Sequence, residues 1–96
     1  MFARLITFNL GPGARAAAEK LVDQFALIFR TRKGFKGATF FADETDGEYG
    51  ALILWETKES VEAEGTAVIP RLQEALAGIA ENPPFIRLFQ VYEPRT

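Results

Sequence analysis

Few side chains in this sequence can carry reactive chemistry. The 96 residues include neither cysteine nor histidine, which excludes thiolate metal ligands and a cysteine nucleophile and removes the commonest general base. The polar groups best suited to hold an organic anion are an amide, two phenols and a guanidinium, at Asn9, Tyr49, Tyr92 and Arg87. Phe40 or Phe41 can stack on an aromatic ligand. These residue types fit a site for a small ionisable organic molecule.

Arg87 has two interpretations. It falls on the same face of a predicted strand as Phe89 and Val91, where a charge needs a partner. An anionic ligand is one such partner, so Arg87 is a substrate-binding candidate together with Phe40, Tyr49 and Tyr92. The pattern favours a structural role, in which the guanidinium reaches water at a sheet edge or pairs with a carboxylate across a subunit interface.

The first third of the chain predicts a strand and a helix. Residues 2–10 are rich in β-branched and aromatic side chains and end at a Gly-Pro-Gly turn, residues 11–13, which indicates a strand. From residue 14 the apolar positions follow a helical period, with cations at the C-terminal end. Gly34 is suited to end this helix.

The remainder predicts a hairpin, a helix and a last strand. Residues 36–43 and 48–56 flank Asp-Gly, the pair that a tight hairpin turn needs. Thr57 can cap a second helix, and Gly and Pro residues predict a break in that helix between residues 65 and 70. Residues 85–93 form a fourth strand that proline stops.

The order β-α-β-β-α-β predicts one ferredoxin-like α+β domain over residues 1–96, with a four-stranded antiparallel sheet. Two helices cover only one face of such a sheet. Residues 51–55 are nevertheless apolar throughout, and the first and last strands are apolar on both faces. The uncovered face would expose a larger apolar patch than a monomer tolerates. We therefore expect a homodimer in which sheet packs against sheet, a dimeric α+β barrel.

Charge is unevenly distributed along a chain of net charge -2. Residues 1–42 hold seven Lys/Arg against two Asp/Glu, whereas residues 43–65 hold eight acidic residues against one Lys. Solvated loops and helix faces are the simpler interpretation, and the alternative places the two patches against each other between subunits. The apolar N-terminal segment is too short for a secretory or membrane-spanning segment, so we expect a cytoplasmic protein with no membrane partner.

Other protein classes share this order of elements. RNA-recognition domains need a stacking aromatic residue where Ala38 stands, and an acidic chain is poorly suited to nucleic acid, so we expect no nucleic-acid partner. An acylphosphatase-like enzyme needs a longer phosphate loop than the "GPGAR" segment supplies. Amino-acid-binding regulatory domains are usually attached to an enzyme domain, which this chain lacks.

Three segments carry a resemblance to a known family. "GPGARAAAEKL", "KGFKGATFFAD" and "YGALILWETKES" resemble the antibiotic biosynthesis monooxygenase-like domains of the dimeric α+β barrel superfamily. The resemblance implies a homodimer with a ligand cavity in each subunit between sheet and helices. Some members oxidise polycyclic phenols with dioxygen and no cofactor, and others degrade haem or isomerise lactones.

The resemblance makes Asn9 and Trp55 the catalytic candidates. Asn9 falls where relatives place a polar residue at the cavity, and its amide can stabilise an enolate. Its structural alternative is a bond to the turn backbone before Gly11. Trp55 matches the family's Trp at the end of the third strand, where core packing is the simpler role. The absence of histidine argues against haem degradation.

Two functions are therefore weighed. The first is a cofactor-independent monooxygenase acting on a small aromatic or polyketide-like substrate, with neither metal nor flavin. The second is a non-catalytic, homodimeric protein that binds a small ligand or is associated with stress, which the short inventory of reactive groups favours.

Overall fold

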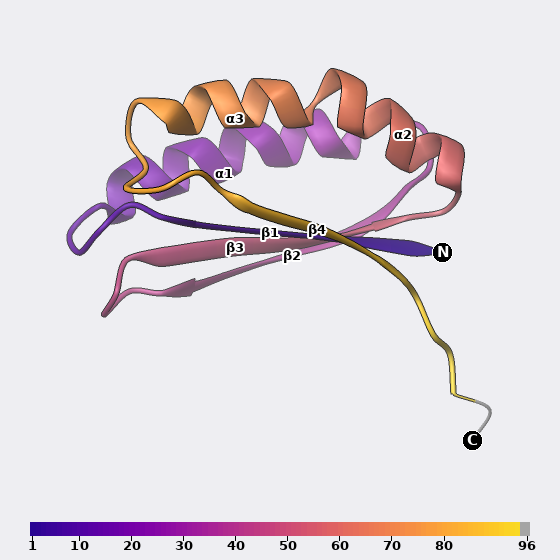
Figure 1. The fold of residues 1–96 in the computed structure, drawn as a ribbon, viewed down its shortest axis with the longest axis horizontal. Coiled ribbons are helices and arrows are strands. Elements are labelled where there is room, and N and C mark those ends of the chain that lie inside the picture. Colours follow the sequence, from indigo (N-terminus) through magenta and orange to yellow (C-terminus); the bar gives the residue numbers. More distant parts are fainter. Residues whose placement is uncertain (95–96) are drawn as a thin grey trace.

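The computed structural model describes residues 1–94 (Figure 1). Seven elements follow along the chain: β1 (Phe2–Asn9), α1 (Arg15–Arg30), β2 (Phe35–Asp43), β3 (Glu48–Trp55), α2 (Lys58–Ala67), α3 (Ile69–Ala77) and β4 (Phe85–Gln90). The strands form one antiparallel sheet in the order β2-β3-β1-β4. All three helices lie on one face of this sheet (Figure 1). The predicted ferredoxin-like α+β fold is confirmed.

Helix α1 packs an apolar stripe on the sheet and ends earlier than predicted. Its buried residues recur at helical spacing along one face and are Ala18, Leu21, Phe25 and Phe29. The helix stops at Arg30, where the Thr31 hydroxyl donates to the Ile28 carbonyl at 2.9 Å. Gly34 instead shapes the turn into β2, with φ +86°, and its carbonyl accepts the Glu56 N–H.

The predicted break in the second helix lies at Val68, between α2 and α3. Thr57 caps α2 as expected, because its Oγ accepts the Ser60 N–H at 3.1 Å. Pro70 lies in the first turn of α3, where a missing N–H removes no helical hydrogen bond. The break therefore lets proline begin a helix rather than interrupt one.

Strand β4 is three residues shorter than predicted. It ends at Gln90, which pairs with Phe2 of β1. One further hydrogen bond follows, in which the Val91 N–H donates to the Met1 carbonyl at 2.9 Å. The chain leaves the sheet there and runs toward the side opposite the helices (Figure 1).

Two turns meet at one end of the sheet. The β2–β3 hairpin turns at Gly47, with φ +75°, and a Cβ at this position would overlap the backbone of Gly11. The Leu10 N–H also donates to the Gly47 carbonyl at 2.9 Å. The hairpin tip and the β1–α1 turn are therefore packed directly together.

The two faces of the sheet differ in burial but are both apolar. On β3, Ala51, Ile53 and Trp55 are buried under the helices. Leu52 and Leu54 alternate with them and lie on the other face, which we call the open face. The strand register places further apolar side chains there, namely Leu5, Phe41, Phe85 and Phe89. The predicted two-sided apolar sheet is confirmed, and the homodimer that would cover it stays a prediction.

Candidate functional site

The predicted site residues do not converge on one place. Phe40 and Tyr49 share a groove of about 240 Å³ between the first half of α1 and the edge strand β2. Asn9, Trp55, Arg87 and Tyr92 lie outside it. The groove thus brings together two of the four predicted substrate-binding residues.

Neighbouring strands position the two aromatic residues of the groove. Tyr49 begins the buried face of β3 and pairs with Ala42 of β2, which also lines the groove. Its ring stacks on Phe8 with centroids 6.1 Å apart, so the phenol is held on a fixed apolar support. Phe40 projects from the same face of β2, two residues before Ala42.

Charged side chains from α1 and the hairpin surround the groove. Arg15 Nε donates to Glu19 Oε1 at 2.7 Å, and Arg15 Nη1 lies 2.6 Å from Glu44 Oε1. The hydrogen bond to Glu19, followed by the charge of Glu44, raises the pKa of the Arg15 guanidinium, and Tyr49 adds to this shift. Asp23 supplies a third carboxylate. The groove thus offers aromatic surface, a paired cation and an excess of carboxylates.

A small void lies beneath the groove, between the sheet and the helices. Its volume is about 20 Å³, and its lining is aliphatic, phenylalanine or glycine throughout, drawn from β1, α1, β2, β3 and α3. Val22 and Phe40 line both the void and the groove. The two spaces therefore adjoin at this pair of residues. The interior cavity that the resemblance implies is reduced here to this void.

Arg87 and Tyr92 lie away from the groove. Arg87 is on the open face of β4, where its guanidinium carbon sits 4.6 Å from the centroid of the Phe89 ring, within the range of a cation–π contact. Tyr92 follows β4 and is 83% exposed. A ligand in the groove would contact neither side chain.

Asn9 and Trp55 lie at opposite ends of the central strands. Asn9 pairs with Glu48, and its Oδ1 accepts the Gly11 N–H at 2.8 Å, the turn bond that the structural alternative describes. Trp55 is fully buried and contacts Phe29 and Phe35 edge-on, with centroids 6.2 and 6.1 Å away. The strand register separates the two side chains by the full length of β1. They do not form a joint site.

A buried ion pair was missed from the sequence. Glu64 of α2 is fully buried, and its Oε1 accepts a hydrogen bond of 2.9 Å from Arg4 Nε on β1. Its Oε2 and the indole Nε1 of Trp55 are the buried side-chain atoms without a hydrogen-bond partner among residues 1–94. Burial raises the pKa of Glu64, whereas Arg4 and the nearby indole N–H lower it.

The interpretation of residues 43–65 as a solvated acidic segment is therefore wrong at Glu64. The helical period contained the signal, since Glu64 follows Val61 by three residues and precedes Val68 by four, on the stripe that faces the sheet.

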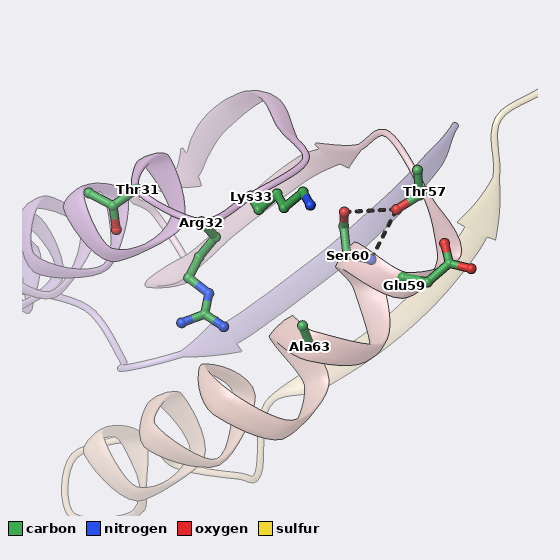
Figure 2. Close-up of a pocket in the computed structure, with 7 residues that line it drawn as sticks. All are labelled: Thr31, Arg32, Lys33, Thr57, Glu59, Ser60 and Ala63. Atoms are coloured by element: carbon green, nitrogen blue, oxygen red, sulfur yellow. Dashed lines mark hydrogen bonds between the residues drawn. The ribbon is translucent and has the colours of Figure 1, made fainter.

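A wider depression, of about 590 Å³, lies between the end of α1 and the start of α2 (Figure 2). Arg32 and Lys33 reach across it toward Ala63 and Ser60 (Figure 2). No aromatic side chain lines it. The Thr57 hydroxyl bonds to Ser60 and already occupies the helix N-terminus (Figure 2). The lining of this depression therefore does not match an aromatic ligand.

Residues 1–94 contain no group of three or more acidic side chains arranged to hold a metal ion. No helix within this part of the chain is long and apolar enough to cross a membrane.

No model of a known protein family matches the chain, and neither does any curated protein. Solved structures match over almost its whole length. SnoaB from Streptomyces nogalater, a cofactor-independent oxygenase, is 20% identical with a TM-score of 0.78, over 98% of this chain and 95% of that one. Rv0793 from Mycobacterium tuberculosis is 14% identical with a TM-score of 0.79, over 99% and 98%.

A Deinococcus radiodurans protein named after the antibiotic biosynthesis monooxygenases is 14% identical with a TM-score of 0.82, over 100% of this chain and 97% of that one. Several further matching structures carry the same name. The chain thus has the fold of the antibiotic biosynthesis monooxygenases, as the sequence resemblance implied. At these identities the likeness shows the fold, and the chemistry depends on the site.

Proposed function

We propose that this protein oxidises a small ionisable aromatic or polyketide-like molecule with dioxygen, without a bound cofactor, in the groove between α1 and β2. The observation that carries the proposal is the groove itself, where Phe40 and Tyr49 lie beside charged side chains and next to an apolar void. The protein also shares its fold with SnoaB, a cofactor-independent oxygenase.

The reaction needs a substrate carbon that readily loses a proton. In overall balance, a CH2 group flanked by aromatic rings and one O2 give a C=O group and one H2O, so the carbon is oxidised and dioxygen supplies both oxygen atoms. The first proton passes to a carboxylate. Asp23 is the candidate acceptor, because among residues 1–94 it has no salt-bridge partner, whereas Glu19 and Glu44 pair with Arg15. The Arg15 guanidinium and the Tyr49 hydroxyl are donors for the enolate oxygen.

The working unit in this proposal is a homodimer joined through the open face. Four large apolar side chains stand at least 37% exposed there, namely Phe41, Leu52, Phe85 and Phe89. A second copy that packs its open face on the first would remove them from water. The groove lies between α1 and β2, and Phe41 lines both the groove and the open face, so a partner packed on the open face would contact one wall of the groove.

Oxygen uptake tests the proposal. Purified protein with hydroquinone or anthrone-type substrates should consume O2 faster than buffer does, with a quinone or ketone product. Tyr49→Phe removes the phenol oxygen from the groove and should lower the rate, whereas Tyr92→Phe makes the same change at an exposed site and should not. Equal rates for protein and buffer would refute the oxygenase.

A binding function without turnover is the second candidate. It is favoured by the pairing of Arg15 with Glu19 and Glu44, which reduces the charge available for catalysis. Calorimetry with non-reactive aromatic analogues separates the two functions. The second candidate would be supported if the native protein binds the analogue without consuming oxygen, and if Phe40→Ala weakens this binding.

A further inference from the structure

The void between the sheet and the helices is the right size for one very small molecule. Its volume of about 20 Å³ compares with the ~10–15 Å³ that a single water-sized particle needs. Pockets for drug-sized ligands are about 300–1,000 Å³. The void is far below this range, whereas the groove outside, at about 240 Å³, lies close to its lower end, so the proposal places the aromatic substrate in the groove.

The chemistry of the lining excludes water. A buried water needs about two to four polar partners to replace its bonds in bulk solvent. The lining consists of side chains such as Ile6, Leu21, Phe25 and Leu72, with no polar side chain among them. Enclosed apolar cavities stay dry and bind apolar guests such as xenon, and the lining of this void has the same chemistry. Molecules that are both small and apolar are therefore the ligands that the lining favours.

The void and the groove share two lining residues, Val22 and Phe40. Most of the void's lining residues are buried, whereas Val22 and Phe40 are partly exposed. A molecule that leaves the void between them arrives beside the Phe40 and Tyr49 rings.

We propose that the void binds one molecule of dioxygen, or an apolar gas of similar size, next to the groove. Binding depends only on the shape and apolarity of the lining. Its role rests on the proposed function, since the void would hold the oxidant within reach of a substrate in the groove.

Dissolved O2 is paramagnetic and serves as its own probe in NMR. In the native protein under O2 pressure, the methyl groups of Ile6, Leu21 and Leu72 should show larger relaxation enhancements than those of Ile53, Val68 and Leu76. All six residues are buried, and only the first three line the void. Equal enhancements in the two sets would overturn the proposal without any variant.

Two matched variants add a second test. Ala51 lines the void and Ala67 is partly buried in α2 outside it. Ala51→Val should fill the void and remove the excess enhancement, and Ala67→Val should retain it. If folded Ala51→Val still shows the excess relaxation enhancement at the void-lining methyl groups, the gas binds somewhere other than the void.

The outcomes separate this proposal from the oxygenase. If the void-lining methyl groups show the excess relaxation enhancement but the protein consumes no oxygen, the gas site is supported and the oxygenase is refuted. Suppose that Ala51→Val loses the excess relaxation enhancement but consumes oxygen as fast as the native protein. The oxygenase proposal would then stand, and the role of the void in supplying dioxygen would be refuted.

Discussion

Arg4 Nε donates a 2.9 Å hydrogen bond to Glu64 Oε1 and so ties the central strand β1 to helix α2 inside the core. The Arg4 side chain is 13% exposed and the Glu64 side chain is fully buried. Removing two charges from water costs nearly as much as their attraction returns, so the intact pair adds little net stability. Loss of one partner leaves the other buried without a counter-charge. The single and double variants should therefore behave very differently.

Arg4→Met should lower the free energy of unfolding at neutral pH by about 3–5 kcal/mol, because it leaves the Glu64 carboxylate buried and unpaired. The double variant Arg4→Met/Glu64→Leu removes both charges and should recover most of that loss. Urea denaturation of the three proteins measures both effects. A double variant no more stable than Arg4→Met would contradict this account.

The raised pKa of Glu64 predicts a pH dependence of stability. As pH rises above the carboxyl's ordinary value of 4.5, the unfolded chain loses this proton before the folded protein does. Linkage then requires the free energy of unfolding to fall until the folded pKa is passed, and to change no further through this group above it. Arg4 is the charged group that faces Glu64, and its Nε lies 2.9 Å from Glu64 Oε1.

In Glu64→Gln the side chain at this position cannot titrate. The free energy of unfolding of the variant, minus that of the native protein, should therefore increase with pH across that window. Urea denaturation in steps from about pH 4 to about pH 8 checks this sign. A difference that stays constant with pH would show that Glu64 titrates normally.

Leu52→Arg should abolish the expected homodimer by placing a charge on the open face. Native mass spectrometry should give twice the chain mass of 10.7 kDa for the native protein and a single chain for the variant. Leu27→Arg is the matched control, because Leu27 lies on α1, away from the open face, and is 62% exposed. A native protein that is monomeric, or a variant that stays dimeric, would show that the open face is not the interface.

Gly47→Ala should destabilise the protein by about 1–3 kcal/mol, since alanine must adopt positive φ and its Cβ would overlap the Gly11 backbone. Gly78→Ala is the control. At φ -90°, with nothing within 4 Å of the added Cβ, it should be neutral or stabilise by up to about 1 kcal/mol. Thermal unfolding of the two variants gives the comparison, and equal melting temperatures would contradict it.

The fold was accessible from the sequence because local signals agreed with one another. Runs of β-branched and aromatic residues indicated the strands, helical period indicated the helices, Asp46-Gly47 marked the hairpin, and Pro70 marked the break near Val68. The errors lie at element ends. Strand β4 ends at Gln90 rather than at residue 93, and α1 ends at Arg30 rather than at Gly34. Apolar patterns indicate that an element exists more sharply than they indicate its last residue.

The candidate site was accessible only in part. Phe40 and Tyr49 were chosen for their chemistry, and the fold brings them together. Arg15, Glu44 and Asp23 were not chosen, because their approach to one groove depends on how α1 lies over the β2 edge. No pattern within a single element records that distance.

The packing of Gly47 against the β1–α1 turn holds one end of the groove together. The Leu10–Gly47 bond joins the hairpin tip to that turn, and the Arg15–Glu44 ion pair joins α1 to the same hairpin. Helix α1 carries Val22, which the groove shares with the void, and the charged side chains Arg15 and Asp23. Any displacement of α1 that widened the space between Val22 and Phe40 would therefore also shift these ionic groups. The size of the groove and its electrostatics are coupled through one helix.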